Sequence, residues 1–505
     1  MKMRAKVIGY IPLDRGSPTK TRLSHLLDIT RAKNDSERLK RLNAAAQAFN
    51  HHDKAKHDHD VKAGAISILC NLLRSCAPFF IVKSKEVNGL CKILLQLYRC
   101  NEDRAKVSFC LDGSTLIIYL LEVIEINYRL GKKGNTKCMT MAQNLVDKLI
   151  SLACVPLVLI KRHEELMSSL VSNINGATGR IVMFQSMKCV AMMSEHTQNK
   201  QVLLTFPGLM KSIEVGSRHM YEAVREESAR IMCNLAWDAR NKAQLAHRSK
   251  LEWAEMVFLT LVEPNASVAA KQYAMKTLSY MASEVNHKVM IINYDNGRIV
   301  KELIRLISDM SSFDKEVTIT ATDLVGRLIC RATASQLVRN NPGFLVILAS
   351  LGCGRNDVAV SAARVLKKLS TFIRHSDVGC HSDLLQALVT MSYGSLTEVL
   401  KWTVKAFAEQ AASPRDRLSM IAHRGLLPAL TLLAEDENDS VRGYALLVLN
   451  ALAADVALAK GVNVDLVLER LVSKNARRTR IQPRCYSPTS IIQFDFDFET
   501  VDCSS

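Results

Sequence analysis

The chain has 505 residues and a formal net charge of +18, from 67 Lys and Arg against 49 Asp and Glu. Because 48 % of the residues are apolar, we expect a large buried core, and a wholly disordered chain is excluded. Aromatic residues make up only 6 %, and with 21 Gly and 11 Pro the turn formers are sparse, which favours helix over strand. The charge makes nucleic acid, acidic peptides and anionic membrane surfaces plausible partners without choosing among them.

The cysteines and the apolar runs predict a compartment. Fourteen cysteines are scattered without a CxxC pair, and most lie inside apolar runs, as buried thiols do in a reducing environment. No N-terminal segment resembles a signal peptide, and the longest apolar run, residues 149–160, is too short to span a bilayer and contains Pro156. We therefore expect a cytoplasmic or nuclear protein, or both, without a transmembrane segment.

The N-terminal region is basic and includes a histidine-rich stretch. Residues 1–37 are predicted to form a partly disordered basic segment, and residues 51–60 read HHDKAKHDHD. Histidine and aspartate are metal-ligand types, but Lys54 and Lys56 repel a cation, and no cysteine or distant histidine pair completes a tetrahedral site. We interpret the stretch as a hydrated helix face and predict no metal and no other cofactor. Weak Zn²⁺ or Ni²⁺ binding remains the alternative.

A helical motif recurs along the chain at intervals of 40 to 47 residues. Taking each start as offset 0, small or apolar residues recur at offsets 4, 7, 8, 11 and 12, a 3.6-residue period that predicts one amphipathic helix per copy. Small residues at offsets 4 and 12 indicate close neighbours on both sides of each helix. The copies start at Ala142, Val182, Val224, Ala270, Val317, Val358, Leu400 and Val441.

A second motif lies between these helices: a short helix, a glycine and an apolar helix. It fits residues 61–73, 111–123, 296–308, 341–351 and 423–435. The glycines share one slot, where a sharp turn between two helices would leave no room for a side chain. They are Gly64, Gly113, Gly297, Gly343 and Gly425.

These segments resemble the armadillo repeat family. AGAISILCNLL, HRGLLPALTLL and VREESARIMCNLA are similar to its second- and third-helix signatures, and a repeat of about 42 residues agrees with it. The resemblance implies an all-α, right-handed α-solenoid of about nine or ten armadillo-like repeats over residues 38–472, followed by a flexible tail, 473–505. HEAT repeats are the nearest alternative. The glycine slot is unclear near 161–171 and 381–383, and 129–137 has the character of an inserted loop.

No catalytic signature stands out in the sequence. Residues 351–357, LGCGRND, contain two glycines but no following GK, and no GxSxG, HExxH or kinase motif occurs. Repeats account for every long stretch of the chain. We therefore predict a binding protein and not an enzyme.

The resemblance places the binding surface on the third helices, which line a concave groove in the family. Offsets 6 and 10 lie on one exposed face of each helix and hold six bases against one acid, Asp323, over five consecutive copies. This segregation predicts a groove for extended acidic or phosphorylated peptides, similar in character to that of the β-catenin type. The candidate groove residues are Lys188, Arg230, Asn234, Lys276, Tyr280, Arg327, Arg364 and Lys368.

Several alternatives remain beside this protein scaffold. A nuclear-transport adaptor of the importin-α type would present Trp at offset 6 and Asn at offset 10, and only Asn234 fits. A nucleic-acid-associated basic solenoid would need aromatics to stack on, and Tyr280 is the only one at these two offsets. Membrane tethering through the basic N-terminus is weaker, because Lys2 stands where N-myristoylation needs glycine. Trp237, Trp253 and Trp402 are each predicted to pack in the core, and for Trp402 the rim is the alternative.

The C-terminal tail ends in an unusual alternation of aromatic and acidic residues. Residues 494–502 read FDFDFETVD, so an extended chain would place three Phe on one side and three acids on the other. The tail residues Phe494 to Asp502 could therefore occupy the protein's own basic groove. The alternatives are a free tail or a short strand on the last repeat.

Overall fold

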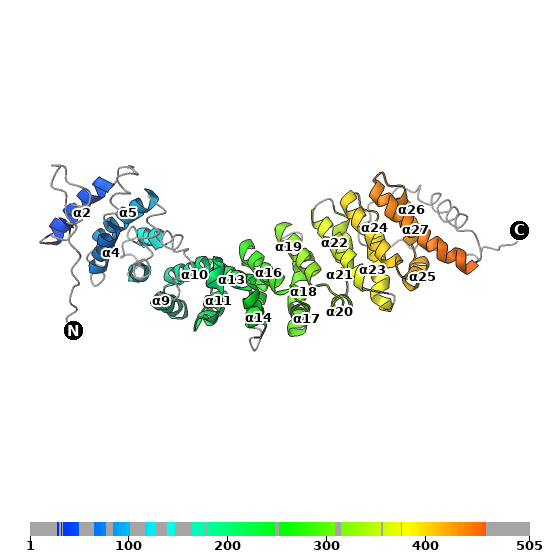
Figure 1. Ribbon diagram of the computed structural model, residues 1–505, viewed down its shortest axis with the longest axis horizontal. Helices are drawn as coiled ribbons and strands as arrows, with labels where there is room; N and C mark the ends of the chain where they lie inside the picture. The colour runs from blue at the N-terminus through cyan, green and yellow to red at the C-terminus, as the bar shows by residue number, and fades with distance from the viewer. Residues whose placement is uncertain are drawn as a thin grey trace. The chain divides into compact units, whose positions relative to one another are not determined.

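The protein is described from a computed structural model. The structure describes residues 28–29, 32, 34–49, 65–76, 84–100, 117–126, 139–146, 164–176, 179–247, 252–308, 315–354, 357–374 and 376–460. The regular secondary structure of these residues is helical throughout, as predicted (Figure 1). Most of the basic segment 1–37, the whole histidine-rich stretch 51–60 and the whole tail 473–505 lie outside them.

The chain divides into two compact units, Met1–Ile231 and Met232–Ser505, and the division falls within α13 (Glu222–Trp237). In the first unit α2 and α4 pack against α5, while α9 packs against α10 and α12. Its labelled helices before α13 are α2 (Asp35–Phe49), α4 (Ala65–Cys76), α5 (Ser84–Cys100), α9 (Glu164–Asn175), α10 (Arg180–Glu195), α11 (Thr197–Thr205) and α12 (Leu209–Ser217).

The second unit repeats one helical theme along the chain. Its first and second helices are α14 (Ala239–His247), α15 (Glu252–Val262), α17 (Val285–Asn293), α18 (Arg298–Ser308), α20 (Ala334–Asn340), α21 (Phe344–Gly352), α23 (Val378–Met391), α25 (Pro414–Ala422) and α26 (Leu426–Ala434), with a 3₁₀ turn, η3 (Tyr294–Gly297), before α18. Its third helices are the end of α13, α16 (Val268–Met281), α19 (Lys315–Leu328), α22 (Asp357–Phe372), α24 (Thr397–Ala411) and α27 (Asp439–Lys460).

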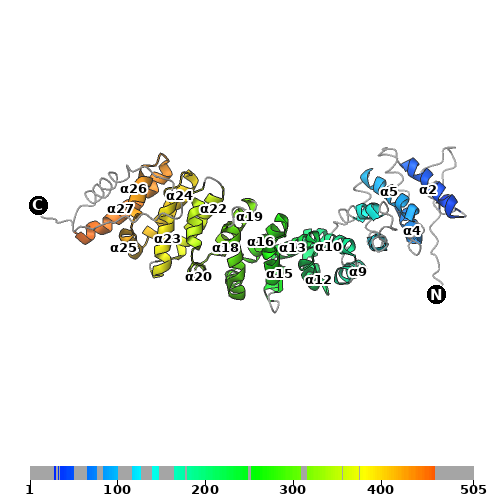
Figure 2. The same ribbon diagram turned by 180° about the vertical axis from the view of Figure 1, so that it is seen from behind.

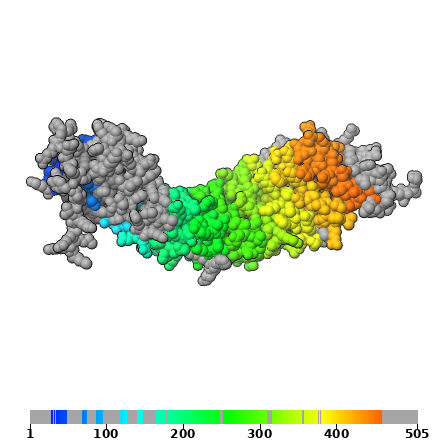
Figure 3. All heavy atoms as spheres, in the orientation of Figure 1, coloured from blue at the N-terminus to red at the C-terminus, as the bar shows by residue number. Residues whose placement is uncertain are grey.

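The third helices stack in chain order. Helix α16 packs on α19, α19 on α22, α22 on α24 and α24 on α27, and both ribbon views show this succession (Figures 1 and 2). On the surface of residues 232–460 the colours likewise pass in chain order from green to orange (Figure 3). Such neighbour-on-neighbour stacking is the architecture of a solenoid, in which no repeat buries its apolar face alone. The predicted all-α, armadillo-like solenoid is confirmed.

A left-handed glycine joins the first and second helices in several repeats. Gly297, Gly343 and Gly425 have φ of 81°, 88° and 84°, a conformation that side chains with a Cβ avoid, so the predicted slot is confirmed at these positions. Gly208, with φ of 77°, fills the same slot between α11 and α12 and was missed. At 381–383 the slot is absent because α23 runs as one helix in place of two. Gly64 and Gly113 lie outside the described residues.

The next repeat caps the C-terminus of most third helices. The last carbonyls of a helix have no partner within it, so a side chain that reaches them joins two repeats. In each case the donor lies at the start of the following first helix. These bonds are Asn199 Nδ2 to Met193 O at 3.1 Å, Asn241 Nδ2 to Leu235 O at 3.1 Å, His287 Nδ1 to Met281 O at 3.2 Å, Thr333 Oγ1 to Leu328 O at 2.8 Å and Arg417 Nη1 to Ala411 O at 2.9 Å.

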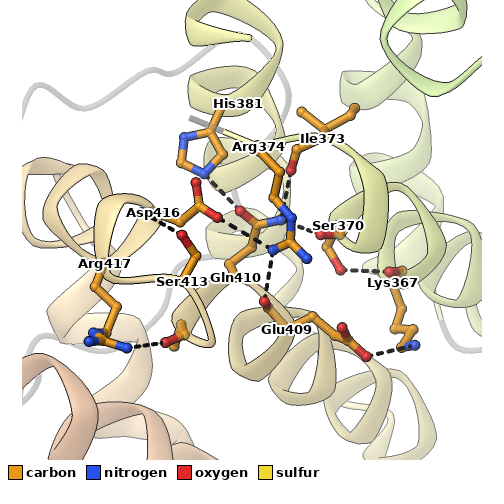
Figure 4. A network of polar contacts seen from close by, with 11 residues as sticks. Lys367, Ser370, Ile373, Arg374, His381, Glu409, Gln410, Ser413, Asp416 and Arg417 are labelled. Atoms are coloured by element: carbon orange, nitrogen blue, oxygen red, sulfur yellow. Dashed lines mark hydrogen bonds and ion pairs between the residues drawn. The ribbon is translucent and has the colours of Figure 1, made fainter. Parts of the chain in front are cut away.

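Helix α22 receives its cap from a different place. The buried amide of Gln410, on α24, donates to the carbonyls of Ser370 and Ile373, the latter at 3.0 Å. His381 Nε2, from α23, donates to the Gln410 Oε1 at 2.7 Å and so orients the amide. Figure 4 shows these bonds together with Arg374, which donates to the Glu409 carbonyl at 2.9 Å. Three helices are thus joined through one side chain.

Helix α27 is long and apolar enough to cross a membrane by length and composition over Asp439–Ala457. Its buried residues recur with the helical period, at Val441, Ala445, Val448, Leu449 and Leu452, and it packs on α24 and α26. This packing accounts for the buried stripe of the helix, whereas Leu446 and Leu447 on its other side are exposed.

Two of the tryptophans differ in burial. Trp253 is 1 % exposed, so its predicted core position is confirmed. Trp237 is 49 % exposed, and its predicted core position is wrong, because it lies in the last turn of α13, beyond the residues that the stacked helices cover.

Candidate functional site

The burial of the third helices defines which of their residues face outward. In the copies starting at Val224, Ala270, Val317, Val358 and Val441, offsets 4, 7, 8, 11 and 12 are buried, as predicted. In α24 the pattern lies one residue earlier than expected. Counted from Val399, offsets 0, 4, 7, 8, 11 and 12 are all buried. Leu400 and Val404 are buried as well, but offsets 8 and 12 of the Leu400 register, Ala408 and Ala412, are not.

The register of this copy was therefore wrong by one residue. Ala406 and Gln410, assigned to the exposed offsets 6 and 10, are both fully buried. The outward positions belong to Lys405 and Glu409. The sequence left this ambiguous because Val399 and Leu400 are both apolar, and either could start the stripe.

The two candidate bases of the first unit are engaged within it. Lys188 is half-buried, with Nζ 6.0 Å from the ring centroid of Phe184. Arg230 forms ion pairs with Glu195 and, at 3.2 Å, with Glu227. Burial raises the pKa of the Glu227 carboxyl, and the charges of Arg230 and Lys188 oppose this effect. Arg230 is thus already neutralised, contrary to the expectation that offsets 6 and 10 hold segregated bases.

The second unit presents a row of outward positions, here called the third-helix face, and Ser361 is the only buried residue among the fifteen named below. It consists of offsets 3, 6 and 10 of α16, α19, α22, α24 and α27, which lie along one side of each helix because they are three and four residues apart. These residues are Tyr273, Lys276 and Tyr280; Thr320, Asp323 and Arg327; Ser361, Arg364 and Lys368; Trp402, Lys405 and Glu409; and Tyr444, Leu447 and Ala451. Asn234, near the end of α13, is half-buried.

Positive charge gathers in the middle of the third-helix face. Lys368 Nζ donates to the Gly326 carbonyl at 2.7 Å, which ties α22 to the last turn of α19. Burial lowers the pKa of Lys368, and the nearby cations Lys288 and Arg327 lower it further. Burial raises the pKa of the Tyr280 hydroxyl, against the influence of Arg327. Arg327 therefore lies close enough to both residues to affect their titration.

The cations of this face form no ion pair with the described carboxylates. Lys401 lowers the pKa of Glu398, and the charges of Lys405 and Arg364 on the face add to this effect. Lys367, just beside it, pairs with Glu409 at 3.1 Å. Within the part of the chain that the structure describes, no carboxylate lies in ion-pair distance of the five bases on the face. These are Lys276, Arg327, Arg364, Lys368 and Lys405.

Rings and cations alternate at the C-terminal end of the face, in what we call the Trp402 ladder: Arg364, Trp402, Lys405 and Tyr444. The Arg364 guanidinium lies 5.8 Å from the Trp402 ring centroid, and Lys405 Nζ lies 5.0 Å from the same ring and 5.9 Å from that of Tyr444. Trp402 is half-buried and Tyr444 is 38 % exposed. The predicted core position of Trp402 is therefore wrong.

The ladder was not predicted, because the expected binding face consisted of offsets 6 and 10 alone. Aromatics recur at offset 3, as Tyr273, Trp402 and Tyr444, and the corrected register of α24 brings Trp402 into this row. The same correction adds Lys405 to the row at offset 6. A search for aromatics one turn before the basic row would have found the pattern.

The described residues contain no group of three or more His, Cys, Asp or Glu side chains that could hold a metal ion. The histidine-rich stretch 51–60 lies outside the residues to which this applies. What the third-helix face offers a ligand is positive charge, aromatic ring surface and hydrogen-bond donors.

Comparisons with known proteins concern the fold. No family model and no curated protein matches the chain. Among solved structures, the chain is similar to an engineered protein from a structural genomics programme, at a TM-score of 0.53 and 16 % identity over 85 % of this chain and 98 % of the other. A designed armadillo repeat protein is matched at a TM-score of 0.32 and 17 % identity, over 57 % of this chain and 99 % of the other. The first similarity concerns the fold alone, and no conclusion is drawn from the second.

Proposed function

We propose that the protein is a non-enzymatic scaffold that binds extended acidic or phosphorylated segments of other proteins on the third-helix face. The observation that carries the proposal is the set of five bases on this face that form no ion pair with a carboxylate of the described residues. Carboxylates or phosphates would form charge-assisted hydrogen bonds with them, which are about twice as strong as neutral ones.

One of the central bases, Lys368, is held in place before a ligand arrives. Lys368 uses one of its N–H groups on the Gly326 carbonyl and keeps two for a ligand. Arg327 presents a planar guanidinium on the exposed surface of α19, suited to bidentate contact with a carboxylate or phosphate. Pre-positioned donors lower the entropic cost of binding.

The geometry of the stack suits an extended ligand. Packed helices lie about 8–10 Å apart, and alternate side chains of an extended peptide lie about 7 Å apart. A peptide that crosses the third helices would therefore meet a new helix about every third residue. The repeated bases on successive helices would then contact acidic side chains spaced about two to four residues apart on one side of the peptide.

The test is binding of synthetic extended decapeptides of acidic, phosphorylated and neutral sequence, measured by fluorescence anisotropy. Lys276→Glu combined with Arg327→Glu should weaken acidic and phosphorylated peptides about tenfold or more, because each reversal replaces an attraction with a repulsion. The control, Arg331→Glu combined with Arg415→Glu, reverses two exposed bases outside the face and should change little. Equal losses in both variants, or no preference for acidic peptides, would contradict the proposal.

A second candidate function is binding of single-stranded nucleic acid, favoured by the rings of Tyr273, Trp402 and Tyr444 beside bases. Nζ of Lys276, for example, lies 5.9 Å from the Tyr273 ring centroid. This function predicts tight binding of a poly-dT oligonucleotide with a steep salt dependence. An acidic-peptide scaffold would bind the same oligonucleotide more weakly than its preferred peptides.

A further inference from the structure

The Trp402 ladder consists of two parallel rows. Offset 3 supplies rings, Trp402 on α24 and Tyr444 on α27, and offset 6 supplies cations, Arg364 on α22 and Lys405 on α24. Residues three apart on a helix have Cβ atoms about 5–6 Å apart, so the rows run side by side across the stacked helices. A ligand that lies between them meets rings on one side and cations on the other.

The ligand that fits two such rows is an extended chain with rings along one edge and acids along the other. Strict alternation of aromatic and acidic residues produces this arrangement, because successive side chains of an extended chain point in opposite directions. The chain itself contains one such segment, FDFDFE at residues 494–499. Phe494 and Phe498 would lie about 14 Å apart when extended, which covers the step of about 8–10 Å between α24 and α27.

The segment is also within reach of the ladder. Helix α27 ends at Lys460, and Tyr444 lies 16 residues earlier on the same helix, about 24 Å away. Phe494 follows Lys460 by 34 residues, which span at most about 110 Å when extended. The intervening chain can therefore return along α27 to the ladder with length to spare.

We propose that the segment Phe494–Glu499 binds the Trp402 ladder of its own chain and competes there with outside ligands. The proposal rests on the proposed function of the third-helix face as a peptide-binding surface, and it names an occupant for one end of that face. Covalent attachment gives the segment an effective concentration of about 1 mM. If the isolated segment binds with a dissociation constant near 0.1 mM, the attached copy lowers the apparent affinity for an outside peptide about tenfold.

The experiment compares the full chain with a chain that ends at residue 489. The probe is a fluorescent peptide with the sequence of residues 493–502, QFDFDFETVD, and binding is measured by anisotropy. We expect the shortened chain to bind the probe about tenfold more tightly than the full chain. A scrambled peptide with grouped Phe and grouped acids should bind several-fold more weakly than the probe. Equal binding of the probe by both chains, or equal binding of both peptides, would overturn the proposal.

Substitutions locate the contact. In the shortened chain Trp402→Ala and Lys405→Glu should each weaken the probe severalfold, whereas Trp402→Phe retains a ring and should bind nearly as the unsubstituted chain does. In the full chain Phe496→Ala combined with Phe498→Ala should reproduce the tighter binding of the shortened chain without touching the solenoid. Unchanged binding in both Lys405→Glu and the Phe double variant would place the segment elsewhere and overturn the proposal.

The same measurements separate this proposal from the broader one. If Lys276→Glu combined with Arg327→Glu abolishes binding of acidic decapeptides while removal of residues 490–505 changes nothing, the scaffold function stands and the internal occupant is refuted. If the shortened chain binds poly-dT in place of the probe and Trp402→Ala abolishes it, the ladder is a nucleic-acid surface and this proposal is refuted.

Discussion

Replacement of Gln410 by leucine tests how strongly neighbouring repeats depend on one buried amide. Gln410 is fully buried on α24, donates to the carbonyls of Ser370 and Ile373 at the end of α22, and accepts from His381 on α23. Leucine fills a similar volume but makes none of these bonds. The substitution therefore leaves two carbonyls and one imidazole N–H without partners in a dry environment.

The expected cost follows from the number of groups left unsatisfied. Each buried polar group that loses its partner costs about 1–3 kcal/mol, and a more apolar side chain recovers part of this. The two carbonyls lie at a helix end, where a small shift admits water, so we count them at the lower limit. We expect Gln410→Leu to lower the free energy of unfolding by about 3 kcal/mol.

The assay is urea unfolding of the full chain followed by circular dichroism, together with hydrogen exchange of peptides that cover residues 365–391. Solenoids unfold through local steps, so exchange identifies the repeats that lose protection. The control is Gln386→Leu, an exposed residue of α23, which should change stability by less than about 0.5 kcal/mol. Equal effects of the two substitutions, or lost protection only at distant repeats, would refute the reasoning.

Two further predictions concern the backbone and pH. Gly343→Ala should destabilise the protein by about 1–2 kcal/mol through its φ of 88° alone, since no atom lies within 4 Å of the position that a Cβ would take. Gly443→Ala lies within α27 and is equally open, so it should stabilise the protein by about 0.5–1 kcal/mol. Thermal melts of the two variants test this, and melting temperatures that shift in the same direction would contradict it. Burial, and to a lesser degree the neighbouring His381, lowers the pKa of His423 below its usual value near 6.5. The unfolded chain thus takes up a proton first as the pH falls, so this contribution to stability is complete above about pH 6.5 and is lost below it. His423→Gln should flatten the decline of melting temperature between pH 8 and pH 5, and an unchanged decline would exclude His423 as its source.

Much of the fold was predictable from the sequence because the same helical pattern recurs in several repeats. The 3.6-residue stripe at Val224, Ala270, Val317, Val358 and Val441 predicts helices whose burial the structure confirms. The left-handed glycines at 297, 343 and 425 were predicted from one shared slot. Local periodicity and backbone conformation are properties of short segments, which a sequence shows directly.

The candidate site was only partly predictable, because it depends on which residues neighbouring repeats cover. The bases Lys276, Arg327 and Arg364 were found on the exposed face, but Arg230 turned out to be paired with acids that lie outside the offsets considered. Charge on a helix face is set by all the side chains that reach it from adjacent helices, and a single row of offsets does not contain them.

Helix α24 shows which features the sequence determines and which depend on tertiary packing. By itself the sequence determined that an amphipathic helix lies at about residues 400–412, since a start at Val399 or at Leu400 gives the same period. Only tertiary packing decided that Gln410 turns inward to cap α22 while Trp402 and Lys405 turn outward into the ladder. The reason is that a shift of one residue rotates a helix by about 100°, a change that periodicity tolerates and a packed neighbour does not.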